Sequence, residues 1–255
     1  MAIERTLVLI RERPLMDLLD LALVVVRRRP VTLGLAALAG IAPFAALNAW
    51  LFATIWDMAP GVPLFLWWFE APLATAPLTL VLGGLMFGER PTARKVAAGV
   101  SRAVFPLLML HGLLRFVPAF WAPPRLAFAN EVVLLERARW WKIWRRGGDL
   151  ASGRAGELFG MAVLQLVITY GFAVLSFIGS SVIVQAILAE KLTWDTPGTS
   201  AFSGLRFQVP IWGAAAFFAV ARFLTYIDQR IRLEGWEVEL RLRAAGEAME
   251  EARRW

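Results

Sequence analysis

The sequence predicts an all-α integral membrane protein: a bundle of six transmembrane helices, with amphipathic helices on the inner membrane surface. Of its 255 residues, 58% are hydrophobic, and several apolar runs approach the roughly 20 residues that cross a bilayer. The 27 Lys and Arg residues cluster between these runs, as basic residues do on the cytoplasmic side of a membrane. We therefore expect residues 1–255 to form a single integral membrane domain.

The last crossing sets the orientation of all the others. Its apolar run, about residues 204–226, leads into an Arg-rich segment, 227–255, that we expect to form an amphipathic helix. Because excess Lys and Arg marks the cytoplasmic side, this end is predicted to lie inside. The remaining crossings then alternate, with both termini in the cytoplasm, over these approximate ranges: 31–56, 64–88, 104–121, 124–136 and 156–188.

Three basic segments are predicted to lie on the inner surface as amphipathic helices, and we call them the surface elbows: residues 14–29, 91–102 and 137–154. Basic side chains near a membrane surface each contribute about 1 kcal/mol of attraction to anionic lipid. We expect lipid headgroups to be bound by Arg27, Arg28, Arg29, Arg94, Lys95, Arg145 and Arg146.

Crossing four is too short for an ordinary spanning helix. About 13 residues separate Pro124 from Glu136, and at about 1.5 Å per residue they extend about 20 Å, short of the roughly 30 Å bilayer core. We expect either a short helix shielded by its neighbours or half of a re-entrant hairpin. Counting this segment as a crossing places every Lys and Arg on the inner side or at its boundary except Arg115, Arg125, Lys191 and Arg206.

Polar side chains inside the crossings are the candidate functional residues. A charge at the centre of a membrane helix costs about 2.5–3.5 kcal/mol on insertion scales and usually has a partner. Residues at a common depth, about 10 Å below the outer surface by helical rise, are Asn48, Glu70, Arg115 and Glu131. We expect an ion pair that fixes helix packing, in which Arg115 neutralises Glu70 or Glu131. The alternative is a small polar cavity that binds a headgroup, an ion or a proton.

His111 belongs to the same polar set, inside crossing three. A lone membrane histidine can relay protons. We favour a neutral imidazole that is hydrogen-bonded to a neighbouring helix.

Composition argues against several classes of function. With no Cys and a single His, disulfides, thiolate chemistry and a zinc site of the usual kind are excluded, and we expect no cofactor. The net charge of +7 is interleaved with apolar runs, so we expect no nucleic-acid partner. The chain has no glycine-rich phosphate loop and cannot complete a Ser/His/Asp set, so we expect no enzyme.

Glycine spacing allows helices to approach closely at three places. The pairs Gly84–Gly88 and Gly156–Gly160, and Ala36 with Gly40, have the spacing of close helix contacts. We expect these contacts within the monomer, and the alternative is a homo-oligomer.

Three short motifs, spread over nearly the whole chain, combine acidic and basic residues beside the crossings. They are Arg13-Pro-Leu-Met-Asp-Leu-Leu-Asp20 with Arg28-Arg-Pro30, Asn130-Glu131-Val-Val-Leu-Leu-Glu136 with Arg145-Arg146, and Tyr226-Ile-Asp-Gln-Arg230 with Arg232-Leu-Glu-Gly-Trp236. In these motifs the chain resembles bacterial six-span proteins related to the membrane domain of glycerophosphoryl diester phosphodiesterases. The catalytic domain of that family has no counterpart here. The resemblance implies the fold and a location in the bacterial inner membrane.

Two function hypotheses follow from these features. The first is a non-enzymatic inner-membrane scaffold or accessory subunit that binds anionic lipid and recruits a protein partner through residues 228–255. The second is a small transporter or lipid-handling protein that uses the intramembrane polar residues. A void at those residues that reaches one surface favours the second hypothesis, and close packing favours the first.

Overall fold

A computed structural model describes residues 14–54, 61–86, 88–89, 91–113, 123–188 and 205–234, and these residues form helices and their connections, without strands. The predicted all-α class is confirmed for this part of the chain. Within it, the helical stretches long and apolar enough to cross a membrane are Pro30–Leu51, Leu66–Met86, Ala155–Ile183 and Phe207–Leu233. Four such stretches indicate a multi-pass membrane protein.

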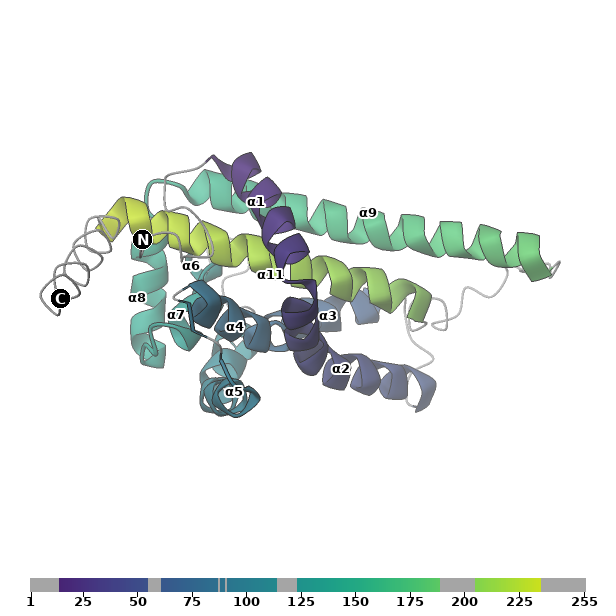
Figure 1. Cartoon of the computed structure of the whole chain (residues 1–255), viewed down its shortest axis with the longest axis horizontal. Coiled ribbons are helices and arrows are strands. Elements are labelled where there is room, and N and C mark those ends of the chain that lie inside the picture. Colours follow the sequence, from purple (N-terminus) through teal and green to yellow (C-terminus); the bar gives the residue numbers. More distant parts are fainter. Residues whose placement is uncertain are drawn as a thin grey trace, which may run out of the picture.

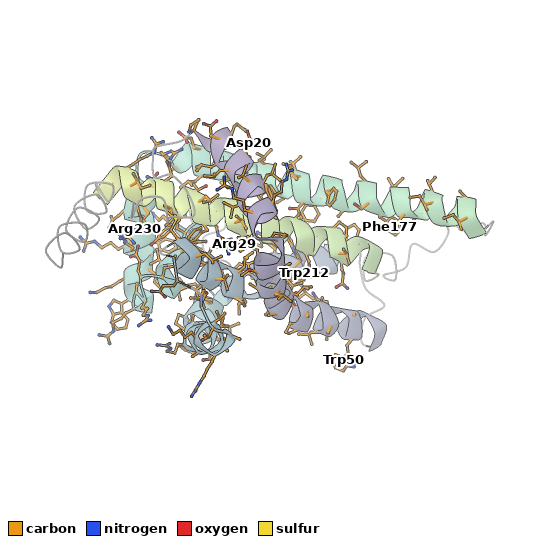
Figure 2. All side chains as sticks on the ribbon, viewed as in Figure 1. Asp20, Arg29, Trp50, Phe177, Trp212 and Arg230 are labelled. Carbon is orange, nitrogen blue, oxygen red and sulfur yellow. The ribbon has the colours of Figure 1, made fainter. Side chains whose placement is uncertain are left out.

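The spans form two antiparallel pairs. α9 (Ala155–Leu188) and α11 (Leu205–Glu234) pack side by side along the long axis and run in opposite directions (Figure 1). In the other pair, α2 (Pro30–Thr54) packs against α3 (Gly61–Ala74) and α4 (Ala76–Met86), which together make the returning span. Arg230 lies towards the end where α11 stops, and Trp50 and Phe177 lie towards the opposite end (Figure 2).

The second span is bent between α3 and α4. Pro77 has no amide hydrogen, so the carbonyl of Leu73 cannot receive the usual hydrogen bond from four residues ahead. Thr75, at the junction, donates from its hydroxyl to the carbonyl oxygen of Ala71 at 2.7 Å. The span therefore consists of two shorter helices that meet at one residue.

The first two spans approach most closely at a glycine. A Cβ atom at Gly40 would lie 2.0 Å from the carbonyl oxygen of Ala74, so only glycine fits there without movement. This is the contact that the spacing of Ala36 and Gly40 predicted. Gly156 and Gly160 differ, because a Cβ at either would have nothing within 4 Å in the described chain.

The second surface elbow and the beginning of crossing three form one continuous helix. α5 (Ala93–Leu108) begins at Thr92, whose side chain accepts a hydrogen bond from the Lys95 amide, and it leads directly into a π-helix, η2 (Met109–Leu113). The second elbow, 91–102, and crossing three, from about 104, were predicted as separate segments, but the helix runs through Pro106 because a buried stripe of Ala103, Leu107 and Leu110 continues across it. Figure 1 views α5 end-on, so α5 crosses α9 and α11 steeply. Residues 114–122 of crossing three lie outside the described residues.

Crossing four is not a single helix. Its residues form α6 (Pro123–Leu126) and α7 (Ala129–Leu134), joined by a turn. Every residue of α7 is buried, so this short segment is shielded by its neighbours, as a helix too short to span must be. α8 (Trp140–Ala151) follows inside the third surface elbow.

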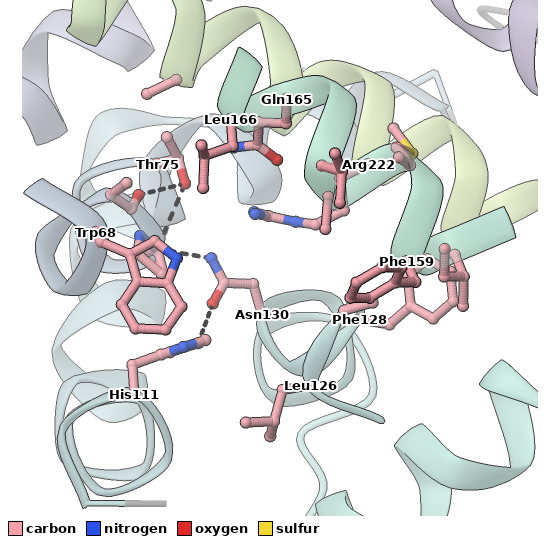
Figure 3. A pocket seen from close by; sticks show the side chains of 18 of the residues that line it. Trp68, Thr75, His111, Leu126, Phe128, Asn130, Phe159, Gln165, Leu166 and Arg222 are labelled. Atoms are coloured by element: carbon pink, nitrogen blue, oxygen red, sulfur yellow. Dashed lines mark hydrogen bonds between the residues drawn. The ribbon is translucent and has the colours of Figure 1, made fainter. Parts of the chain in front are cut away.

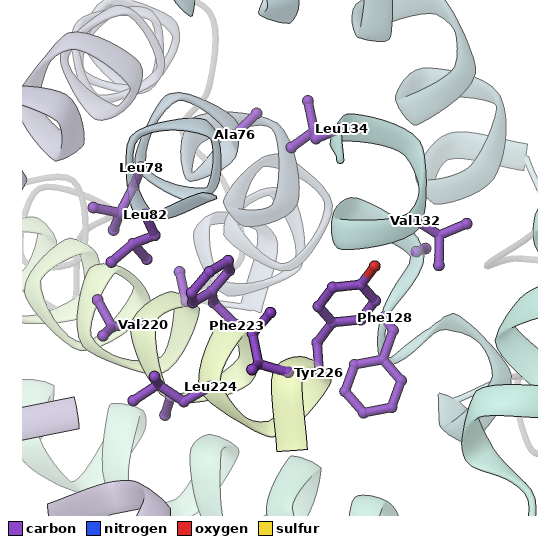
Figure 4. Close-up of a cluster of buried hydrophobic side chains, with 14 of the residues drawn as sticks. Ala76, Leu78, Leu82, Phe128, Val132, Leu134, Val220, Phe223, Leu224 and Tyr226 are labelled. Atoms are coloured by element: carbon purple, nitrogen blue, oxygen red, sulfur yellow. The ribbon is translucent and has the colours of Figure 1, made fainter. Parts of the chain in front are cut away.

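The first surface elbow packs across α11. It is α1 (Leu15–Arg28), which buries Leu18, Ala22 and Val25 on one face and contacts α11 along that face. These residues belong to a core that also joins α4, α7 and α11 through Leu82, Val132, Phe223 and Tyr226 (Figure 4). The core fixes α7 and α11 against each other, and α7 carries two of the polar residues of interest.

The close approach at Gly40 predicts that alanine substitutions at two glycines of α2 have different effects on the melting temperature. Gly40→Ala should lower the melting temperature of the detergent-solubilised protein, because its Cβ would collide with the backbone of Ala74. Gly34→Ala is the matched control on the same helix, with nothing within 4 Å of the added Cβ. It should leave the melting temperature unchanged or slightly raised, since alanine favours helix by up to about 1 kcal/mol. Equal effects of the two variants would show that spans one and two do not meet at Gly40.

Candidate functional site

A cavity of about 260 Å³ lies among α3, η2, the α6–α7 segment, α9 and α11. Most of its lining is apolar. The polar side chains that line it are Thr75, His111, Asn130, Gln165 and Arg222, drawn in Figure 3. Few polar groups within an apolar wall are typical of sites that bind small molecules.

Asn130 of α7 connects two other elements at this cavity. Its side-chain amide donates to the carbonyl oxygen of Pro72 at 2.6 Å, and its side-chain oxygen lies 2.9 Å from His111 Nε2 (Figure 3). Because that oxygen can only accept, Nε2 of His111 carries the hydrogen. His111 is therefore bonded to a neighbouring helix, as the sequence predicted. Asn130 itself was quoted only as part of a motif, and its role at the site was missed.

Glu131, beside Asn130, forms an ion pair with Arg222 of α11. Arg222 Nε lies 2.9 Å from Glu131 Oε1, and the Glu131 side chain is 0% exposed. The predicted partner, Arg115, lies outside the described residues. Arg222 was missed because the sixth crossing was taken to end at residue 226. The helix in fact continues to Glu234, which places Arg222 well inside the apolar span.

Asn48 and Glu70 form a second polar group. The Asn48 side-chain amide donates to Glu70 Oε2 at 2.6 Å and joins α2 to α3. Glu70 was one of two expected partners of Arg115, and within the described residues it bonds to Asn48. The described members of the predicted polar set therefore lie in two groups, Asn48 with Glu70 and His111 with Glu131, and the second group adjoins the cavity.

Beyond Arg222, the same face of α11 continues into a network of ion pairs. Tyr226 donates to Glu136 Oε1 at 2.8 Å, and Arg146 binds both oxygens of Glu136 at 2.8 and 3.0 Å. Arg230 lies 4.0 Å from the same carboxylate. Arg146, predicted as a headgroup ligand, is thus bound to Glu136. The members of this network belong to the second and third motifs of the sequence, but nothing there showed which of them meet.

A second ion-pair network ties the beginning of α9 to the end of α11. Asp228 accepts from Arg154 and from Arg232, each at 2.9 Å, and Arg154 also pairs with Glu157. Burial alone would lower the pKa of Arg154, but its bonds to Glu157 and Asp228 outweigh this effect and raise that pKa above the ordinary value. Arg154 therefore stays charged and holds the two helix ends together.

The other predicted headgroup ligands lie on the surface. The exposed residues of this set are Arg27, Arg28, Arg29, Arg94, Lys95 and Arg145. Their role in binding lipid stays a prediction. Residues 235–255, which make up most of the expected partner-binding segment, lie outside the described residues.

The cavity offers hydrogen-bonding groups and one ion pair, and no metal site. Among the described residues, no three His, Asp or Glu side chains gather as a metal ion would need. No protein-family model, curated protein or solved structure matches the chain. Its function must therefore be inferred from the cavity and from its position beside the spans.

The Arg222–Glu131 pair predicts that the stability losses of the two single variants do not add in the double variant. Arg222→Leu or Glu131→Leu alone should cost about 3–5 kcal/mol of unfolding free energy in detergent, because each leaves a buried charge without its partner. The double variant should recover most of that loss. Glu157→Leu is a control at the more exposed pair with Arg154, and we expect it to cost less than about 1 kcal/mol. Losses that simply add in the double variant would mean that the two charges do not interact.

Proposed function

We propose that the protein is a non-enzymatic lipid-handling protein of the bacterial inner membrane, which holds the head of a membrane amphiphile in its cavity. One observation carries this proposal: the wall of the cavity reaches the apolar surface of α9. Phe159, Val163 and Leu166 line the cavity and are also 53%, 46% and 50% exposed. An amphiphile in the bilayer thus meets an opening whose rim is apolar.

The chemistry of the wall suits such a ligand. Asn130, His111 and Arg222 provide polar groups inside the cavity, and aromatic and aliphatic side chains cover the rest. Pockets for whole drug-sized ligands measure about 300–1,000 Å³, so this somewhat smaller volume fits a headgroup with the first part of a chain. The remaining chain would lie along α9, among the surrounding lipids.

The cavity favours lipid handling over the scaffold hypothesis. Close packing of the polar residues was the expected sign of a scaffold, and a void at those residues was the expected sign of a protein that handles lipid. The exposed basic residues of the surface elbows support a complementary role in which the inner face binds anionic lipid. Recruitment of a partner through residues 228–255 stays a prediction.

The proposed topology places both termini in the cytoplasm. The ends of α4 and α11 and the beginning of α9 lie towards the same end of the molecule (Figure 1), so the chain between the two pairs of spans begins and ends on one side. This holds whether residues 104–136 make two further crossings, giving the predicted six, or form a re-entrant segment. The interrupted α6–α7 segment and the steep direction of α5 favour the re-entrant form.

Cysteine labelling tests this topology, because the chain contains no cysteine. Single Cys residues at Asp57 and Thr196 should react with a membrane-impermeant reagent added from outside, and those at Ala93 and Asp149 should not. A Cys at Ala122 decides the middle segment: labelling from outside means six crossings, and protection means a re-entrant segment. Outside labelling at Asp149 would contradict both arrangements.

Filling the cavity tests the proposed function. Ala162 lines the cavity on α9, and Ala162→Phe should reduce the amount of lipid that photo-crosslinks to the cavity wall. Ala186→Phe makes the same change at an exposed position of the same helix that does not line the cavity, and it should have no effect. Crosslinking that is unchanged by Ala162→Phe would show that lipid does not occupy the cavity.

A further inference from the structure

The charge of the cavity wall limits which headgroup it can accept. Among the described residues that line the cavity, only Arg222 carries a permanent charge. Glu131, 2.9 Å away, already neutralises it. His111 makes its bond to Asn130 from Nε2 and needs no charge to do so. The wall around the ligand is therefore neutral as a whole.

An anionic head would be poorly stabilised in this setting. It would bring a second negative charge close to the carboxylate of Glu131, which is 0% exposed, within a wall that is mostly apolar. In a low-dielectric site both the repulsion and the lost hydration of that charge are large. An anion that binds Arg222 would share its single positive charge with Glu131, so the three groups together would carry a net negative charge within the apolar wall.

An uncharged head with hydroxyl and carbonyl groups meets none of these costs. The guanidinium of Arg222 extends into the cavity between Gln165 and Asn130 (Figure 3), where it can donate to a ligand oxygen while it keeps its bond to Glu131. The side-chain oxygen of Gln165 can accept from a ligand hydroxyl.

We infer that the cavity selects an uncharged, hydroxyl-bearing lipid head of the diacylglycerol type over the anionic head of a phospholipid. The inference rests on the proposed function and adds the class of ligand. The inference implies that the protein has two distinct lipid sites. The exposed arginines Arg27, Arg28 and Arg29 attract anionic lipid at the inner surface, and the cavity takes an uncharged one.

The test compares diacylglycerol with phosphatidic acid, two lipids that can share the same acyl chains and differ by one phosphate. Each carries the same photoreactive group in its chain and is added to the full-length protein in phosphatidylcholine vesicles. Crosslinks to the α9 segment that includes Phe159, Val163 and Leu166 report occupancy of the cavity. Crosslinks near Arg27–Arg29 report the surface site in the same sample.

In the wild-type protein, diacylglycerol should half-saturate the cavity at a concentration at least about tenfold lower than phosphatidic acid does. Glu131→Gln leaves Arg222 free to bind an anion, and the preference should reverse. Adding Arg222→Gln to that variant makes the wall neutral again and should restore the preference for diacylglycerol. The surface crosslinks of phosphatidic acid should be the same in all three proteins.

The remaining outcomes separate the two proposals. Equal or tighter binding of phosphatidic acid by the wild type overturns the inference and leaves the lipid-handling function standing. A preference that does not change in Glu131→Gln overturns it as well. If neither lipid crosslinks to α9 while phosphatidic acid still labels the surface site, the proposed function itself fails. If Glu131→Gln does not fold, the ratio of the half-saturating concentrations of the two lipids in the wild-type protein decides the inference by itself.

Discussion

The ion pair between Glu131 and Arg222 is the constraint on which the arrangement around the cavity depends. A carboxylate that is 0% exposed and a guanidinium inside an apolar span are each costly alone, so α7 and α11 are held together at this point. The same contact places Asn130 of α7 where it reaches both Pro72 and His111. Three elements, α11, α3 and η2, thus take their relative positions from α7, which is itself too short to cross a membrane.

Much of the fold could be predicted because it depends on local sequence. The apolar runs gave the spans, and the buried face of α1 follows from Leu18, Ala22 and Val25 at helical spacing. The contact at Gly40 was also foreseeable, because small residues are what allow helices to approach closely. In each case the relevant residues lie within a few turns of one helix.

The candidate site was harder to predict because it joins residues that are far apart in the chain. Glu131 and Arg222 are separated by 91 positions, and depth along a helix does not determine which neighbour a side chain faces. Asn48 and Glu70 were predicted at the same depth as Glu131, but they bond to each other and not to Glu131 or Arg222. The continuous helix through Pro106 was missed for a related reason: the burial of Ala103 and Leu107 against other helices outweighs the local effect of proline.

The junction at Thr75 divides the second span into two helices with different surroundings. Trp67, Trp68, Ala71 and Pro72, which form one wall of the cavity, belong to α3, whereas α4 is packed into the core through Leu78, Leu82 and Met86. The other half of the span, α3, packs through Trp67 and Ala74 into a separate buried cluster with α9 and α11. The hydrogen bond from Asn130 to the Pro72 carbonyl ties α3 to α7 beside the cavity. One wall of the cavity thus rests on packing that is separate from the packing of α4.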